Sequence, residues 1–266
     1  MRELVEQLAK GQRLDTKSLS ALLKQCTLDD SLLQFLRDYA VRTARQQFGL
    51  GIYIRGLIEL SSYCRNDCLY CGLRRSNRSA ERYRLTADEV LECCREGYKL
   101  GFRTFVMQGG EDGTHSDAWL EELICRIRSL YPDVAITLSL GERSEESYRR
   151  LKRAGANRYL LRHEAADEEL YASLHPDSRG IKHRLSCIEA LQRAEYQVGM
   201  GMMIGVMGQS INHIAEDLAL IAEKRCEMVG IGPFLPHHAT PLGTEPAGDL
   251  RLTLAAVAIA RLLLPK

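Results

Sequence analysis

The sequence has no hydrophobic run long enough to cross a membrane. Its longest apolar stretches, Leu254 to Ala260 and Leu262 to Leu264, fall short of the roughly 20 residues that a spanning helix needs. The chain opens with the charged residues Arg2, Glu3 and Lys10, so we expect no secretory signal. These absences favour a cytoplasmic protein without a membrane role.

The sequence also lacks an excess of charge of one sign. Its 36 basic and 35 acidic residues give a formal net charge of +1, and no block of lysine and arginine stands out. Proteins that bind nucleic acid usually carry a basic face, so we expect no nucleic-acid partner. The 45% hydrophobic and 27% charged residues are instead typical of a globular protein with a sizeable core.

The pattern of cysteines argues against a secreted disulfide framework. The nine cysteines are odd in number and unevenly spaced, which favours reduced thiols, some of which hold a metal. Three of them lie within eight residues, at Cys64, Cys68 and Cys71. The others are predicted to be small apolar residues of the core: Cys26, Cys93, Cys94, Cys125, Cys187 and Cys226.

Residues 1–50 are predicted to form a helical extension, because apolar residues recur there at helical spacing without strand signals. From residue 51 a strand-then-helix alternation repeats six times. The predicted strands are Ile54–Leu60, Thr104–Gln108, Ala135–Leu140, Arg158–Arg162, Val198–Val206 and Met228–Leu235. The predicted helices are Ala87–Leu100, Asp117–Tyr131, Ser144–Ala154, Lys182–Ala194, Ile211–Lys224 and Leu252–Leu264. Continuous apolar strands separated by amphipathic helices indicate a parallel sheet covered by helices.

The number of strand–helix units indicates how much of a barrel the chain forms. A complete barrel of eight strand–helix units takes about 250 residues, which is more than residues 51–266 provide. We therefore predict an α/β fold with a partial TIM-like barrel of six units, (βα)6, in residues 51–266. A doubly wound open sheet is the alternative. Functional residues of such barrels gather in the loops at the carboxyl ends of the strands.

The three clustered cysteines follow the first predicted strand. Three thiolates on one short loop suit three irons of a four-iron cluster and leave the fourth iron open for an outside ligand. Zinc is the main alternative, but a structural zinc site typically has four ligands in two pairs, and no second Cys-x2-Cys follows. Three unrelated core thiols are the remaining alternative.

The cysteine pattern resembles the signature of a known superfamily. Cys64-x3-Cys68-x2-Cys71, with Tyr70 before the third cysteine, is similar to the motif of radical S-adenosylmethionine (radical SAM) enzymes. The resemblance implies a partial barrel with one 4Fe-4S cluster, whose open iron is chelated by the amino and carboxylate groups of SAM. It also implies that an electron from the cluster cleaves SAM to methionine and a 5′-deoxyadenosyl radical.

Eight blocks within about residues 30–265 resemble, more specifically, the FeFe-hydrogenase maturases of the HydE type. They are Arg55–Leu60, Cys68–Arg75, Arg82–Thr86, Gln108–Asp112, Thr137–Glu142, Arg158–Glu164, Met228–Phe234 and Thr240–Leu242. The resemblance implies maturation of the hydrogenase active-site cluster and a small-molecule or iron-complex substrate. An electron donor such as flavodoxin or ferredoxin, and other hydrogenase maturases, are the partners it implies. Biotin synthase and methylornithine synthase are similar to the same family and remain alternatives.

The resemblance assigns SAM contacts to several loops. Gly109, Gly110 and Glu111 are expected at the SAM amino group, and the two glycines let a ligand approach the backbone closely. Arg184 is expected at the SAM carboxylate, which a guanidinium group binds through two hydrogen bonds. The remaining expected contacts are Tyr70, Glu164 at the ribose, and Met203 beside the methionyl group.

The substrate cavity is expected to include Ser139, Glu142, Arg162 and His237. Because side chains alternate along a strand, Arg162 and Glu164 share one face and His163 takes the other. Charged residues facing a barrel mouth are costly unless they are paired or bind a ligand. The resemblance implies that Arg162 binds an anionic group, and a purely structural Arg–Glu pair is the alternative.

The chain departs from the resembled family in two places. Met207 stands where the family usually has proline, which removes a restraint on the loop after the fifth strand. The family also continues past the position of Leu264 with two further strand–helix units. We therefore expect a fragment or a natural short form with two exposed sheet edges. Such a form is expected to cleave SAM slowly without completing maturation, and a non-catalytic iron–sulfur scaffold is the alternative.

Overall fold

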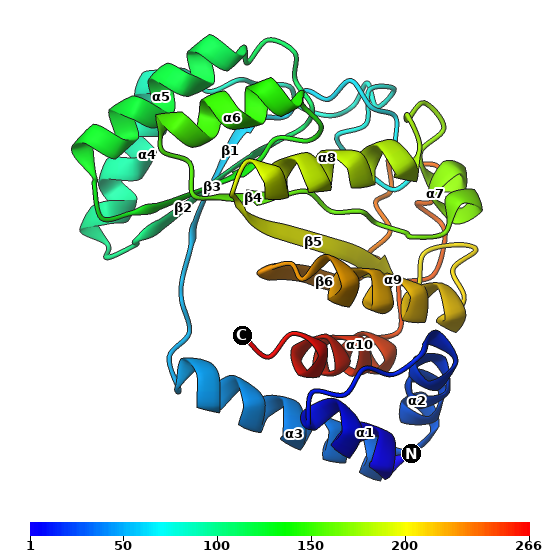
Figure 1. Ribbon diagram of the computed structural model, residues 1–266. Helices are drawn as coiled ribbons and strands as arrows, with labels where there is room; N and C mark the ends of the chain where they lie inside the picture. The colour runs from blue at the N-terminus through cyan, green and yellow to red at the C-terminus, as the bar shows by residue number, and fades with distance from the viewer.

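The computed structural model describes residues 1–266 and is built around a six-stranded sheet. The strands are β1 (Gly56–Ser61), β2 (Thr104–Gly109), β3 (Ala135–Ser139), β4 (Arg158–Leu160), β5 (Gln197–Ile204) and β6 (Met228–Pro233). Each strand pairs in parallel with the next one along the chain (Figure 1). Because this order lacks the strand reversal of a doubly wound sheet, the predicted partial barrel is confirmed and the open-sheet alternative is excluded.

Helices follow the strands in each unit and cover one face of the sheet (Figure 1). They are α4 (Ala87–Lys99), α5 (Asp117–Leu130), α6 (Glu145–Ala154), α8 (Ile181–Arg193), α9 (Ile211–Lys224) and α10 (Leu250–Leu263). Strand residues that point toward these helices are buried, such as Ile58 and Phe105. The alternate residues of β1 point to the inner face of the half-barrel, where Leu57 is 56% exposed. The core therefore lies between sheet and helices, and the inner face is open.

Three helices form the N-terminal part of the chain: α1 (Arg2–Ala9), α2 (Thr16–Leu28) and α3 (Asp30–Phe48). The carboxylates of Asp15 and Asp29 cap α2 and α3 by accepting hydrogen bonds from backbone amides of the first turn. These helices pack against α9 and α10, and their buried residues join the same hydrophobic core as the barrel. None of the helices combines the length and the hydrophobicity that a membrane-spanning segment requires.

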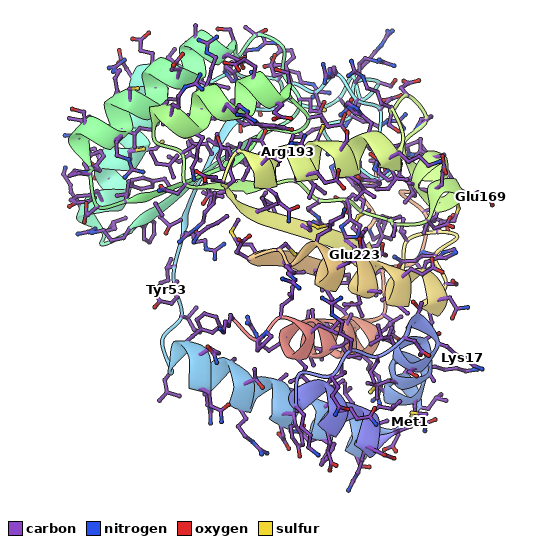
Figure 2. The ribbon with its side chains drawn as sticks, viewed as in Figure 1. Met1, Lys17, Tyr53, Glu169, Arg193 and Glu223 are labelled. Atoms are coloured by element: carbon purple, nitrogen blue, oxygen red, sulfur yellow. The ribbon has the colours of Figure 1, made fainter.

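Residues 49–55 connect α3 to β1 without regular secondary structure. Figure 2 shows Tyr53 on this segment, and the charged side chains of Lys17, Glu169 and Glu223 projecting from the outer helices. Ile52 is 90% exposed and Tyr53 is 78% exposed. The apolar side chains of this connection therefore contribute little to the core.

The structure moves four predicted strand bounds by two residues and adds one helix. Strand β1 starts at Gly56 rather than Ile54, and β5 ends at Ile204 rather than Val206, where Gly205 adopts φ 82°. Strand β4 ends at Leu160 rather than Arg162, because its regular pairing with β5 stops there and only a single bridge, from Glu164 to Met202, follows. Strand β6 ends at Pro233 rather than Leu235. The short helix α7 (Glu168–Leu174), which was not predicted, is capped by the Asp167 carboxylate.

Two of the six cysteines expected in the core are not there. Cys26, Cys94, Cys187 and Cys226 are buried, whereas Cys93 and Cys125 are exposed. The buried residues of α4 are Val90, Cys94 and Gly97, so Cys93 falls on the solvent side of the same helix. The prediction for Cys93 and Cys125 was wrong because each lies on the solvent side of an amphipathic helix, away from the buried face.

The two outer strands are β1 and β6, each of which pairs with one neighbour only. A groove of about 210 Å³ runs beside β6 and is lined by Val229, Ile231 and, from α10, Val257. The two sheet edges expected from the sequence are therefore present.

Candidate active site

The cysteine loop, residues 62–77, follows β1 at the carboxyl edge of the sheet, where the loops of all six units meet. Cys64, Cys68 and Cys71 are partly buried, free thiols. Burial, and then the neighbouring Cys71 and Cys64, raise the pKa of the Cys68 thiol to about 12. The thiol therefore stays protonated until a metal displaces the proton.

The donor set of this loop fits a four-iron cluster better than a single metal ion. No three His, Cys, Asp or Glu side chains are grouped closely enough to hold one ion between them. A zinc ion needs four ligands around one point, whereas a four-iron cluster offers each thiolate a separate iron. Three thiolates on one loop, without a fourth ligand, match a cluster with one open iron.

The turn after β2 touches the cysteine loop directly. A Cβ atom on Gly110 would lie 2.3 Å from the Tyr63 carbonyl oxygen and 2.6 Å from the Cys64 Cβ. On Gly109 it would lie 3.3 Å from the Ser61 carbonyl oxygen. Glycine at position 110 thus allows the close approach of the loop that carries Cys64. The expected SAM contacts of Gly109 and Gly110 stay predictions.

Glu111 joins three loops through its carboxylate, which is 8% exposed. It accepts hydrogen bonds from Arg65 Nε at 3.0 Å and Nη2 at 2.8 Å, and from the Glu142 amide at 3.0 Å. The side chain lies over Gly141, where a Cβ atom would meet the Glu111 Cγ at 2.0 Å. The carboxylate is therefore already occupied by protein groups, and Arg65 is a site residue that the sequence did not indicate.

Arg184 projects from α8 toward the same loops and is 13% exposed. Its Nε lies 2.9 Å from Glu142 Oε1, and its Nη2 lies 3.9 Å from Glu111 Oε1. The hydroxyl of Tyr171 accepts a further hydrogen bond from Nε at 3.3 Å. The structure thus brings Glu111, Glu142 and Arg184 together, with the guanidinium held in place by two carboxylates.

Arg162 and Glu164 form a pair with unsatisfied polar atoms. Arg162 Nε lies 3.1 Å from Glu164 Oε1 in an ion pair that lacks hydrogen-bond geometry. Arg162 Nε, Arg162 Nη2 and Glu164 Oε2 are buried without a hydrogen-bond partner. The hydroxyl of Thr137 on β3 is also buried and unpartnered. Buried polar atoms without partners are costly, so these groups point to a polar ligand. Thr137 was missed, although it lies two residues before Ser139 and hence on the same face.

His163 lies on the other side of this segment, as the alternation predicts. Its Nε2 is 3.1 Å from Asp217 Oδ1 of α9, and both side chains are fully buried. Asp217 Oδ1 also accepts a hydrogen bond from the Ala166 amide at 2.6 Å. This contact ties the segment after β4 to the helix behind the sheet.

Tyr70 is held by a histidine that the sequence did not indicate. The Tyr70 hydroxyl lies 2.9 Å from His175 Nε2, and His175 Nδ1 lies 2.8 Å from the Tyr171 carbonyl oxygen. Nδ1 therefore donates to the carbonyl, and Nε2 accepts from the tyrosine hydroxyl. Burial lowers the pKa of His175 to about 4, so the ring is neutral at neutral pH.

The remaining predicted residues lie at other strand ends. Ser139 ends β3 opposite Gln108, and Met203 lies in β5 next to a small buried cluster around Tyr171. His237 is exposed, and its ring packs beside the cysteine loop, where a Cβ on Gly72 would lie 2.9 Å from Nε2. His237 and His238 line a cavity of about 460 Å³ together with Cys71.

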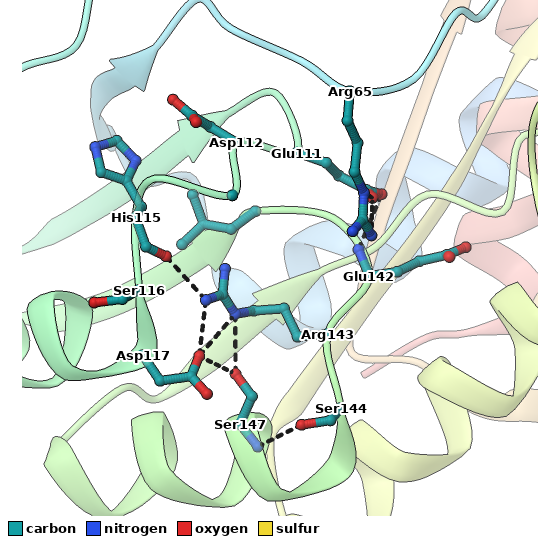
Figure 3. A pocket seen from close by; sticks show the side chains of 12 residues that line it. Arg65, Glu111, Asp112, His115, Ser116, Asp117, Glu142, Arg143, Ser144 and Ser147 are labelled. Carbon is teal, nitrogen blue, oxygen red and sulfur yellow. Dashed lines mark hydrogen bonds and ion pairs between the residues drawn. The ribbon is translucent and has the colours of Figure 1, made fainter.

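A second, polar cavity of about 320 Å³ lies beside Glu111, which lines it, between the ends of β2 and β3 (Figure 3). At one end Arg65 points toward Glu111, and at the other Arg143 pairs with Asp117 at 2.7 Å. The lining is polar apart from Leu140. The sequence did not indicate this cavity, because its residues come from loops that no single motif joins.

Comparison with known proteins gives a consistent family. The model of the radical SAM superfamily matches residues 58–221. The chain is 44% identical over 221 residues to the [FeFe] hydrogenase maturase subunit HydE of Thermotoga maritima, a match that covers 83% of this chain and 63% of that protein. It is 27% identical over 263 residues to the 3-methylornithine synthase of Methanosarcina acetivorans, over 98% of this chain and 73% of the relative.

A solved structure agrees with these matches. The crystal structure of a methylornithine synthase superposes with a TM-score of 0.90 and 26% sequence identity, over 99% of this chain and 77% of that one. The family model alone covers more than half of the chain and includes the cysteine loop. Enzymes of this family use a 4Fe-4S cluster together with SAM, which agrees with the three-thiolate donor set. The chain therefore belongs to the radical SAM superfamily and is a radical SAM enzyme.

Proposed function

We propose that this enzyme reductively cleaves SAM to methionine and a 5′-deoxyadenosyl radical during maturation of the FeFe-hydrogenase active-site cluster. The observation that carries the proposal is the 44% identity to the HydE maturase over 83% of the chain. The match spans less than two thirds of the length of that relative. The substrate and the partners are for this reason part of the proposal.

The cofactor roles follow from the cysteine loop and the carboxyl-edge network. Cys64, Cys68 and Cys71 each bind one iron, and the bound cluster supplies the electron that cleaves the SAM sulfonium. Arg184 binds the SAM carboxylate, because Glu142 and Tyr171 fix its guanidinium on one side. Backbone groups of Gly109, Gly110 and Glu111 receive the SAM amino group.

The inner face receives the rest of SAM and the substrate. Glu164 binds the ribose, Met203 packs beside the methionyl group, and Tyr70 packs near the bound cofactor. The unpartnered guanidinium atoms of Arg162 bind an anionic substrate group. Ser139, Glu142 and His237 line the substrate side. All of these residues belong to the core domain, which we assign to residues 51–266. Residues 1–50 form its helical extension.

We also propose the partners. The substrate is a small molecule or an iron complex, and the electron comes from a donor such as flavodoxin or ferredoxin. Other hydrogenase maturases act before or after this step.

A different radical SAM reaction is the second candidate. The TM-score of 0.90 with methylornithine synthase over nearly the whole chain favours it. An iron–sulfur scaffold without catalysis is the third candidate, because the open inner face gives weak protection to a radical.

One preparation distinguishes the three candidates. The chain is reconstituted anaerobically with iron and sulfide, reduced with dithionite, and assayed with SAM for 5′-deoxyadenosine. The same preparation is then assayed for activation of apo-hydrogenase with the partner maturases present. Activation of apo-hydrogenase would support the proposal over the second candidate. Release of 5′-deoxyadenosine without activation is the slow, uncoupled cleavage expected of this chain and excludes the scaffold, whereas a loaded cluster without 5′-deoxyadenosine favours the scaffold.

A further inference from the structure

We propose that Arg82 is a positioning residue that closes the cysteine loop around the cluster site and stabilises the reduced cluster through its charge. The inference rests on the proposed function, because it requires that Cys64, Cys68 and Cys71 bind a cluster. Arg82 lies outside the cysteine motif, in the segment that leads to α4.

The guanidinium of Arg82 donates hydrogen bonds to four main-chain carbonyls. Nη1 donates to the carbonyls of Ser62 and, at 3.0 Å, Leu73. Nη2 donates to the carbonyl of Arg74 at 2.8 Å and to that of Asn77 at 3.1 Å. Five N–H donors in a planar fork make arginine the side chain suited to this task.

The positions of these carbonyls show how Arg82 closes the cysteine loop. Ser62 lies two residues before Cys64, and Leu73 lies two residues after Cys71. One side chain therefore joins the two ends of the segment that holds all three thiols. Other contacts across the segment, such as Arg74 Nη2 to Asp67 Oδ2 at 2.6 Å, begin after Cys64 and do not reach the residues before it.

The backbone next to Arg82 is fixed against the start of the same loop. The Ser62 amide donates to the Tyr83 carbonyl at 3.2 Å, and the Tyr83 amide donates to Ser62 Oγ at 2.8 Å. These two bonds place the Arg82 side chain over the loop. The loop shape is thus set by bonds within the protein.

The charge of Arg82 is not cancelled by a carboxylate, because all four of its acceptors are neutral carbonyls. A four-iron cluster becomes more negative on reduction, so a nearby cation favours the reduced form. The neighbouring Arg78 provides a contrast. It lies in the same segment and is exposed at the surface.

The experiment compares Arg82→Gln, Arg82→Lys and the control Arg78→Gln in the full chain. Each protein is reconstituted anaerobically, and iron release to a chelator, the midpoint potential of the cluster and thermal unfolding of the cofactor-free protein are measured. For Arg82→Gln we expect iron release about tenfold faster than in the wild type. We also expect an equilibrium constant for reduction about tenfold lower, which is about 59 mV for one electron.

The lysine variant separates the two effects of the side chain. Arg82→Lys keeps the positive charge but loses the planar arrangement of N–H donors. We therefore expect faster iron release than in the wild type and an unchanged midpoint potential of the cluster. Arg78→Gln is expected to match the wild type in both measurements. The cofactor-free Arg82→Gln protein is expected to unfold a few degrees below the wild type, because it loses hydrogen bonds to the loop carbonyls, and Arg78→Gln at the wild-type temperature.

Three outcomes overturn the inference. Wild-type iron release and potential in Arg82→Gln would show that the guanidinium does not act on the cluster. A large drop in the unfolding temperature of its cofactor-free form would make Arg82 a residue of the fold alone. If the wild type itself binds no cluster, the proposed function fails and this inference falls with it.

Discussion

The cysteine loop and the inner face of the half-barrel differ in how completely their polar groups are satisfied. The loop is held by bonds within the protein, including those from Arg82 and the contact between Glu111 and Arg65. On the inner face, Arg162, Glu164 and Thr137 retain buried atoms without partners. The difference indicates that bonds within the protein fix the cysteine loop, whereas the inner face presents polar atoms to a ligand.

The largest expected effect comes from removing a thiol of the loop. Cys68→Ser should abolish cluster binding, because only the three thiols of this loop reach one cluster. Cys125→Ser is the matched control, since Cys125 is an exposed thiol on α5. Iron content and the visible absorption of the reconstituted proteins measure the result. An intact cluster spectrum in the Cys68 variant would contradict the assignment.

Gly110→Ala tests the contact between the turn after β2 and the cysteine loop. The new Cβ would lie 2.3 Å from the Tyr63 carbonyl, so we expect a stability loss of about 3 kcal/mol and weaker cluster binding. In Gly113→Ala the added Cβ meets nothing within 4 Å, which makes this variant the control. Denaturant unfolding and iron content measure the two effects. Equal behaviour of both variants would show that the close approach is not needed.

The His175–Tyr70 contact predicts a dependence of stability on pH. Burial lowers the pKa of His175 from 6.5 to about 4, so between these values the unfolded chain binds a proton that the folded chain does not. Stability therefore falls as the pH drops from 6.5 to 4, by about 2 kcal/mol at pH 5. His175→Gln should remove this part of the pH dependence in urea unfolding. His238→Gln, at an exposed histidine, should keep it. An unchanged pH profile in the His175 variant would be the contrary result.

Two hydroxyl deletions compare a satisfied group at the end of β1, next to the cysteine loop, with an unsatisfied group on the inner face. The Ser61 hydroxyl donates to Asp112 at 2.6 Å and accepts from the Tyr63 amide at 3.0 Å, so Ser61→Ala should lower stability by about 1 to 2 kcal/mol. Thr137→Val removes a buried hydroxyl without a partner and should raise the stability of the cofactor-free protein by up to about 1 kcal/mol. Denaturant unfolding of both variants measures these two changes in stability. Destabilisation by both changes would remove the contrast between the regions.

The sequence predicted the parts of the fold that depend on local pattern. Six strands and the helices between them follow from continuous apolar runs and helical periodicity, and Cys64, Cys68 and Cys71 form a motif within one loop. It did not predict α7, because the segment after β4 carries a capping Asp167 but only a short apolar pattern.

The sequence did not predict the contacts that shape the site, because these contacts join residues far apart in the chain. Arg65 meets Glu111, Tyr70 meets His175, and Gly110 meets Tyr63 only after the units have assembled. The glycine motif predicts close approach of a ligand, and the structure adds a contact that the motif did not indicate, the approach of Gly110 to the cysteine loop. A motif identifies reactive residues, but it does not identify the residues that hold them.

The central claim is that the cysteine loop binds a four-iron cluster whose open iron receives SAM. Electron paramagnetic resonance of the reconstituted, dithionite-reduced protein, recorded without and with SAM, tests it most directly. The account predicts the signal of one reduced 4Fe-4S cluster per chain and a change of that signal when SAM is added. A signal that SAM leaves unchanged, or a protein that binds zinc in place of the cluster, would contradict the account.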